Sequence, residues 1–182
     1  MRSVYVLFAA GFEEVEGLTA VDLLRRAGVD VKMVSIMGRL QITGAHNISV
    51  NTDILIEDIK EEADMLVLPG GMPGTNYLRE HEGLAELLKK QYKAGKWVAA
   101  ICAAPSVLGG LGFLKDKKAT SYPGCLEGIL VGEYSEEAVV VDDNVITSRG
   151  VGTAIAFALS LIEVLAGKEK SEEVAASIIY SA

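Results

Sequence analysis

The chain has 182 residues, of which 50% are hydrophobic and 23% are charged, and its formal net charge is −8. This composition is ordinary for a globular protein with a substantial core. Because no basic cluster offsets the negative charge, we expect neither nucleic acid nor an anionic membrane as the main partner. We also expect no membrane span and no secretory signal, since the apolar runs are too short.

The chain contains two cysteines, Cys102 and Cys125. Two are too few for a disulfide scaffold, and neither a C-x-x-C pair nor a metal-type spacing occurs. We therefore expect free thiols and a cytoplasmic protein. The thiol chemistry considered below needs neither a metal nor an organic cofactor.

Strand-like and helix-like segments alternate along the chain. In chain order we expect a strand over 3–9, a helix over 13–28, a strand over 29–36, short β segments with a final helical turn over 39–59, a strand over 64–71, helices over 73–80 and 82–96, a strand over 97–101, a helical segment over 104–112, a connection over 117–122, a β pair over 137–148, and helices over 151–167 and 170–182.

Apolar strands separated by helices indicate a parallel sheet that is covered on both faces. The fold class that we predict is α/β, of the flavodoxin-like, doubly wound type, with a mostly parallel sheet sandwiched by helices. The β segments over 39–59 form a β-hairpin excursion from it. Because no linker, repeat or low-complexity tract is visible, we expect a single domain over residues 1–182.

Ligands of such folds bind outside the carboxyl ends of the strands. Cys102 stands at one of these ends, between the apolar run WVAAI and the small residues AAPSV. A strand-to-helix turn there would expose the thiol to a helix N-terminus and lower its pKa. The alternative is a buried cysteine that only packs the core.

Glycines and acids follow two other strands. The backbone amides of Gly71 and Ala103 are candidates for an oxyanion hole, with Gly70 beside them, although a plain turn would also use glycines. Of the three acids that open the first helix, we expect at most one to face the thiol. So close to a thiolate, that carboxyl would hold its proton.

Two further residue types narrow the chemistry. Arg149 either holds an anionic group or forms a structural salt bridge. Both histidines, His46 and His81, precede Cys102. Cysteine proteases and glutamine amidotransferases of this fold class carry their general base after the cysteine, so that arrangement is absent.

Six segments occur together in an order that is typical of one protein family: GFEEVE, DLLRRAG, LVLPGG, AAICAAP, ATSYPG and ITSRGVGTAIAFALSLIEVLAGKE. On these motifs nearly the whole chain resembles the DJ-1/ThiJ/PfpI superfamily, and most of all the DJ-1 branch of short bacterial members. The resemblance implies a homodimer and Cys102 as the reactive cysteine at a strained elbow. It also implies Glu16 as the protonated partner of the sulfur, and Gly71 and Ala103 as the amide donors.

The chain departs from the family pattern in three places. The histidine that many members carry after the cysteine is missing near Val131, which weakens the case for proteolysis. His46 stands near a position where some members have arginine, and Cys125 replaces an expected aromatic residue. Thiol addition to an aldehyde stays available because Glu16 can move the proton.

The resemblance implies three alternative functions. The first is an enzyme of the glyoxalase or deglycase type that acts on small dicarbonyls or glycated protein, with Arg149, His46 and Gly70 near the substrate. The second is a sensor of oxidative stress that forms a sulfinate on Cys102. The third is a chaperone or binding module in which the cysteine is only inherited.

Overall fold

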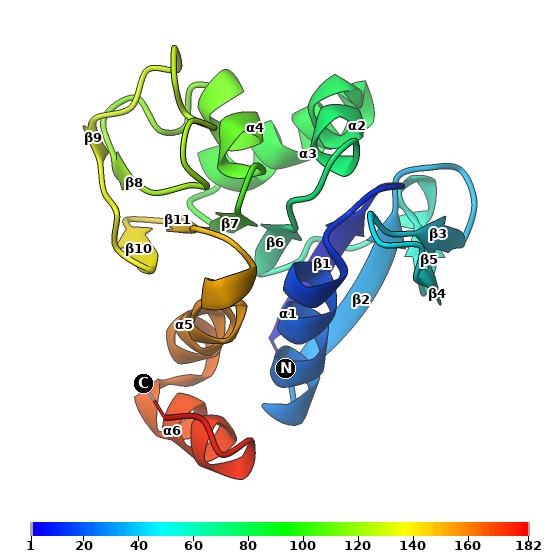
Figure 1. The fold of residues 1–182 in the computed structure, drawn as a ribbon. Helices are drawn as coiled ribbons and strands as arrows, with labels where there is room; N and C mark the ends of the chain where they lie inside the picture. Colours follow the sequence, from blue (N-terminus) through cyan, green and yellow to red (C-terminus); the bar gives the residue numbers. More distant parts are fainter. Residues whose placement is uncertain (1, 182) are drawn as a thin grey trace.

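The computed structural model describes residues 2–181. Seven strands in this range form one sheet: β1 (Ser3–Phe8), β2 (Asp30–Ser35), β5 (Ile54–Leu55), β6 (Met65–Leu68), β7 (Trp97–Ile101), β10 (Val139–Asp142) and β11 (Val145–Ser148). Their order is β10-β11-β7-β6-β1-β2-β5, and only the β10–β11 pair is antiparallel (Figure 1). The predicted mostly parallel sheet is confirmed.

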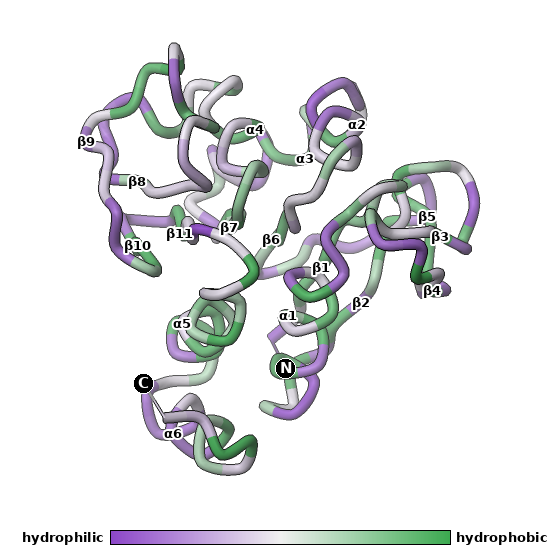
Figure 2. The backbone as a smooth tube through the Cα atoms, in the orientation of Figure 1, coloured by the Kyte–Doolittle hydropathy of each residue, from purple (hydrophilic) through white to green (hydrophobic). Residues whose placement is uncertain are grey.

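Helices cover both faces of the sheet. One face carries α1 (Glu14–Arg26), α5 (Ala154–Ala166) and α6 (Lys168–Ser177), and the other carries α2 (Gly74–Glu80), α3 (Glu82–Lys93) and α4 (Pro105–Gly110). Figure 2 shows α5 and the central strands as mainly hydrophobic, and α6 as more polar.

Strand β7 shows why these apolar runs form strands that are buried on both faces. Ala99 and Ile101 pack into the core beneath α1 and α5, whereas Val98 and Ala100 pack into the core beneath α3 and α4. Successive side chains of a strand point to opposite faces, so each face needs an apolar residue at every second position.

Smaller elements lie outside the main sheet. Two short pairs form separate sheets: antiparallel β3 (Gln41–Thr43) with β4 (Ser49–Asn51), and parallel β8 (Lys118–Ala119) with β9 (Glu133–Tyr134). The short helices η1 (Ile56–Asp58) and η2 (Val151–Thr153) complete the list of elements. The expected hairpin excursion over 39–59 is therefore present.

The last helix differs from the prediction. It begins at Lys168 and ends at Ser177, and only Gly167, with φ of 92°, separates it from α5, which ends at Ala166. The expected extension to residue 182 is wrong for residues 178–181, because Ile178 and Ile179 form a turn and the next two residues have no regular structure; residue 182 lies outside the described range. None of the helices within 2–181 is long and apolar enough to cross a membrane.

The topology creates a natural position for a site. From β1 the chain moves outward to β2 and then returns to the other side of β1 as β6. This reversal is the switch point at which ligands of doubly wound folds bind. The segments that follow β1, β6, β7 and β11 all meet at this carboxyl edge, because these strands are parallel.

Candidate active site

Cys102 forms a sharp elbow directly after β7. Its φ is +65°, a left-handed conformation that is uncommon for residues other than glycine and costs free energy. Its N–H donates to the Ser148 carbonyl at 3.0 Å, and its carbonyl accepts from the Tyr122 N–H at 2.9 Å. These two hydrogen bonds hold the strained backbone in place, and the expected strand-to-helix turn is confirmed.

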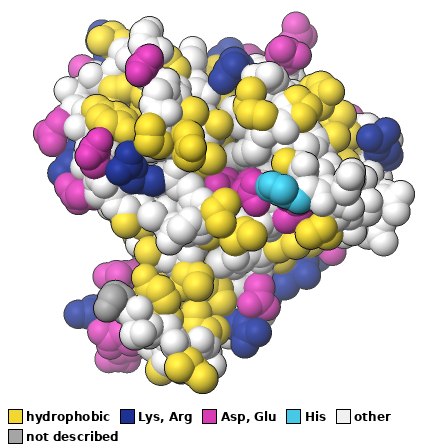
Figure 3. Space-filling model, in the orientation of Figure 1, with side chains coloured by type: hydrophobic (Ala, Val, Ile, Leu, Met, Phe, Trp, Pro, Cys, Tyr) yellow, Lys and Arg dark blue, Asp and Glu magenta, His cyan; other side chains and the backbone are white. Residues whose placement is uncertain are grey.

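The elbow opens into a cavity of about 550 Å³ at the carboxyl edge of the sheet. In Figure 3, acidic side chains gather in the middle of this face, beside a histidine and between apolar surfaces. The lining comes from the segments after five strands and comprises Glu13, Glu16, Gly71, Cys102, Tyr122, Pro123, Arg149, Gly150, Val151, Gly152 and Thr153.

Glu16 is a fully buried carboxyl group in the first turn of α1. Its Oε2 accepts a hydrogen bond from the Gly70 N–H at 2.9 Å, while Oε1 has no partner among residues 2–181. Burial raises the pKa of Glu16 to about 7, against the lowering effects of the Gly70 N–H and Cys102. Near neutral pH the carboxyl can therefore both hold and release a proton.

The structure corrects the expected low pKa of Cys102. Burial of the sulfur, and then the nearby Glu16 carboxylate, raise the pKa of this thiol to about 12, and only the Ala103 N–H lowers it. The predicted direction was wrong for two reasons. The helix that begins after the elbow, α4, has only six residues, and Glu16 of α1 stands beside the sulfur. A thiolate therefore forms most readily while Glu16 carries the proton.

The two predicted oxyanion donors are the backbone N–H groups of Gly71 and Ala103. Neither the Gly71 N–H nor the Ala103 N–H donates to a backbone carbonyl within residues 2–181. The Ala103 N–H instead reaches the Cys102 sulfur. Because the carbonyl of the same peptide unit is bonded to Tyr122, the Ala103 N–H points the opposite way. Gly71 lines the cavity with φ of +91°, a conformation that favours glycine.

Gly70 is the spacer between the thiol and the acid. A Cβ at this position would lie 2.6 Å from Cys102 Cβ and 2.7 Å from Glu16 Oε2. Both separations are far below van der Waals contact, so a side chain would push the two groups apart. Gly70 thus lets Cys102 and Glu16 approach each other closely, and its N–H donates a hydrogen bond to Glu16.

The acids that open α1 do not behave as expected. Glu13 and Glu16 both line the cavity, although at most one acid was expected there. Glu14 is buried, and its carboxylate accepts the His46 backbone N–H at 2.7 Å and contacts His46 Nδ1 at 2.8 Å. These contacts lower the pKa of Glu14 and raise that of His46. They come from the β3–β4 hairpin, which the local sequence around α1 does not reveal.

His46 itself stays outside the cavity. Its side chain is 67% exposed and touches the site only through Glu13, whose Oε2 lies 3.6 Å from His46 Nδ1. The ligand atoms of Glu13, Glu14 and His46 lie within 4.8 Å of one another. Glu14 is already occupied by backbone N–H groups, so this cluster fastens the hairpin to α1.

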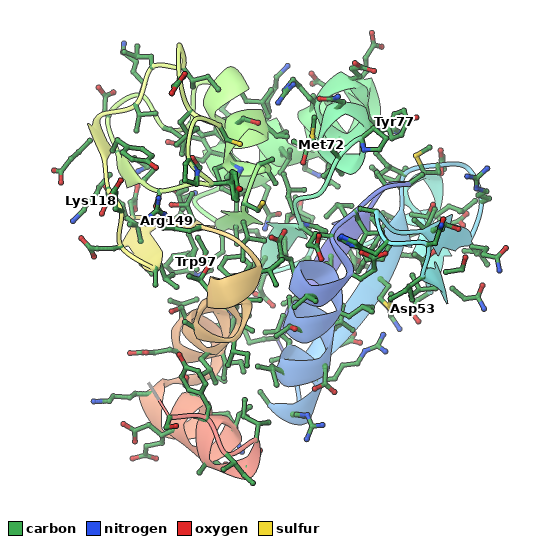
Figure 4. All side chains as sticks on the ribbon, viewed as in Figure 1. Asp53, Met72, Tyr77, Trp97, Lys118 and Arg149 are labelled. Carbon is green, nitrogen blue, oxygen red and sulfur yellow. The ribbon has the colours of Figure 1, made fainter. Side chains whose placement is uncertain are left out.

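Arg149 lies on the other rim of the cavity, beside the segment between β8 and β10 (Figure 4). Its guanidinium donates to two backbone carbonyls, those of Ser121 and Glu136, each at 3.4 Å. These partners are carbonyls rather than a carboxylate, so the charge of Arg149 remains available to an anionic group in the cavity.

A family model described as "DJ-1/PfpI family" matches residues 2–164. The chain belongs to the DJ-1/PfpI family. Among its relatives in the family is "Protein dj-1beta" of Drosophila melanogaster, which is 41% identical over 184 residues, covering 99% of this chain and 98% of that protein. "Glutathione-independent glyoxalase DJR-1.2" of Caenorhabditis elegans is 35% identical over 162 residues, covering 87% and 86% respectively. The solved structure "Toxoplasma gondii DJ-1, oxidized" is similar with a TM-score of 0.96 and 36% identity, covering 100% of both chains.

Several parts of the site in this DJ-1/PfpI chain were not predicted from the sequence. Tyr122 and Pro123 line the cavity, and the Tyr122 N–H fixes the elbow. Thr153 lies there too, and its Oγ1 accepts from the Arg149 and Gly150 N–H groups at 3.2 and 3.1 Å. The motifs ATSYPG and TSRGVGT contain these residues, but only the folded chain places them beside Cys102.

Proposed function

We propose that this protein uses Cys102 to act on small reactive dicarbonyls, as a glutathione-independent glyoxalase or a protein deglycase does. One observation carries the proposal. The strained thiol of Cys102 and the buried carboxyl of Glu16, with a pKa of about 7, line one open cavity together with Gly71. Within residues 2–181, neither the Gly71 N–H nor the Ala103 N–H donates to a backbone carbonyl. This set supplies a nucleophile, a proton carrier and an oxyanion hole.

The reaction follows from these groups. The Cys102 thiolate adds to the aldehyde carbon of methylglyoxal, and the oxygen that gains the charge is stabilised by the N–H groups of Gly71 and Ala103. Glu16 first protonates this oxygen. It then carries a proton from the former aldehyde carbon to the neighbouring carbon, while the hydroxyl proton passes to the neighbouring oxygen. These two transfers convert the hemithioacetal to a thioester. Water cleaves the thioester, releasing lactate and the Cys102 thiol.

Two further observations support this function. The chain is similar to a relative that is named a glutathione-independent glyoxalase. Arg149 places a positive charge on the cavity rim, where it would attract the carbonyl oxygens of a dicarbonyl or the carboxylate that forms. Proteolysis stays the least favoured activity, since both histidines precede Cys102 in the chain.

The test is lactate release from methylglyoxal without glutathione. We expect wild-type protein to release lactate, and Cys102→Ala to lose the activity, because the nucleophile is absent. Glu16→Gln should lower kcat by about 10²-fold or more, in the range of lost general acid–base catalysis. Lys89→Ala, on the exposed face of α3, is the control for handling. Undiminished lactate release by Cys102→Ala would refute the proposal.

A second candidate function is a response to oxidation. The Cys102 sulfur is partly exposed in the cavity, and a protonated Glu16 beside it would donate a hydrogen bond to an oxygen bound on sulfur. The test is a peroxide titration followed by peptide mass spectrometry. We expect Cys102 to lose its free thiol before any methionine is oxidised, and the reverse order would contradict this function.

We also propose that the chain forms a homodimer. Val15, Val151 and Ile155 are each more than a third exposed, near the N-terminal ends of α1 and α5, which pack side by side. An apolar surface of this kind is typical of a subunit interface. Light scattering during gel filtration should give twice the chain mass, and Ile155→Glu should shift it to the mass of one chain.

A further inference from the structure

Cys125 has no part in the chemistry proposed for Cys102, yet the fold brings it close to that residue by two independent routes. The first route is the backbone. The Tyr122 N–H donates to the Cys102 carbonyl at 2.9 Å, and the Cys125 N–H donates to the Tyr122 carbonyl at 3.1 Å. The turn that begins on the backbone of Cys102 therefore ends at Cys125.

The second route passes through Arg79. Its Nη2 donates to Ser106 Oγ at 2.7 Å, and Ser106 Oγ donates to the Ala103 carbonyl at 2.6 Å. The guanidinium is thereby fixed beside the residue that follows Cys102. Burial raises the pKa of Cys125, and the positive charge of Arg79 opposes this rise without cancelling it. Arg79 thus acts on the Cys125 thiol while it is bonded beside Cys102.

Both thiols are free and partly exposed. After burial and Glu16, negative charge on Cys125 also raises the pKa of Cys102. Pro123 lines the Cys102 cavity and also a second cavity of about 490 Å³, so open space lies on both sides of the turn that carries Cys125. Gly124 and Gly128, with φ of +83° and +74°, flank Cys125 in a segment of turns without helix or strand.

We propose that Cys125 is the resolving cysteine of Cys102. Once a peroxide has oxidised Cys102, Cys125 closes an intramolecular disulfide with it, and oxidation stops before the sulfinic acid. This inference rests on the second candidate function and gives its product. It assigns to Cys125 a role at the position where the family pattern leads one to expect an aromatic residue.

The chemistry balances in two steps. The Cys102 thiolate attacks one peroxide oxygen, the O–O bond breaks, and Cys102 sulfenic acid and hydroxide (water after protonation) form. The Cys125 thiolate then attacks the Cys102 sulfur. An S–S bond forms, the S–O bond breaks, and the departing hydroxide takes up a proton as water. Peroxide is reduced by two electrons, one from each sulfur, and an external dithiol would restore both thiols.

The experiment treats the reduced full-length chain with hydrogen peroxide, unfolds it, blocks the remaining thiols with iodoacetamide and measures the intact and peptide masses. We expect the wild-type chain to lose two hydrogen atoms, to take up no iodoacetamide, and to yield a linked peptide containing Cys102 and Cys125. Cys125→Ser should instead gain two oxygen atoms on Cys102. Cys102→Ser, the matched control, should keep Cys125 alkylatable. Reduced Cys125→Ser should release lactate from methylglyoxal like the wild type, since Cys125 does not line the active-site cavity.

Three results would overturn the inference, and they separate it from the function beneath it. Two oxygen atoms on Cys102 with Cys125 still alkylatable would refute the resolving role while preserving oxidation as a response. A disulfide between two chains, seen as a dimer on a non-reducing gel, would refute the intramolecular bond. Two unchanged thiols would refute both the resolving role and the redox function.

Discussion

Replacing Glu16 by glutamine should increase the free energy of unfolding, relative to that of the wild type, as the pH rises. The pKa of Glu16 is raised from 4.5 to about 7, so between these values the folded state holds a proton that the unfolded state has released. Folding stability therefore falls as the pH rises through this window, and stays low above it. At about 1.4 kcal/mol per pH unit, the loss is about 3 kcal/mol.

Urea unfolding of the wild type and Glu16→Gln between about pH 4 and pH 8 measures this effect. The free energy of unfolding of the variant minus that of the wild type should increase by about 3 kcal/mol across the range. Glu14→Gln is the matched control with the opposite sign. The pKa of Glu14 is lowered, so its carboxylate stabilises the fold above the unfolded pKa and loses this effect in acid. A difference for Glu16→Gln that does not change with pH would refute the reasoning.

Three further predictions follow from single contacts. Gly70→Ala should destabilise the fold by about 1–3 kcal/mol in urea unfolding and abolish lactate release, because its Cβ would overlap Cys102 and Glu16; wild-type stability would contradict this. Arg149→Met should raise the KM for methylglyoxal with little change in kcat, and an unchanged KM would exclude its role in binding. The pKa of His46 is raised, so its contact with Glu14 stabilises the fold below the unfolded pKa and fades as the pH rises. The stability lost in His46→Gln should therefore be larger at acidic than at alkaline pH.

The sequence predicted those features that depend on local pattern. The sheet was predictable because β7 is apolar at every position, and β1 at every position after Ser3, which only strands covered on both faces require. The elbow at Cys102 was predictable because a buried strand ends there and a helix with Pro105 in its first turn begins. Once the sheet is parallel, the carboxyl ends of its strands define the location of the site.

Features that depend on distant contacts were not predictable. Glu13, Glu14 and Glu16 look equivalent in sequence. The β3–β4 hairpin gives them different surroundings, because it buries Glu14 against His46 from 32 residues away. The pKa of Cys102 was predicted in the wrong direction, because neither burial of the sulfur nor the approach of Glu16 across Gly70 is visible along the chain. The family resemblance singled out Glu16, and the structure adds the physical reason.

The central claim is that Cys102 and Glu16 work as a pair that shares one proton. The most direct measurement is the rate of Cys102 alkylation by iodoacetamide against pH, read at the Cys102 peptide. In the wild type the rate should rise only toward pH 12, because burial and the Glu16 carboxylate raise the pKa of the thiol to about 12. In Glu16→Gln the rise should move to lower pH and yet stay above the ordinary thiol pKa of 9.0, since the carboxylate is gone while burial persists. The same profile in both proteins would contradict the pairing.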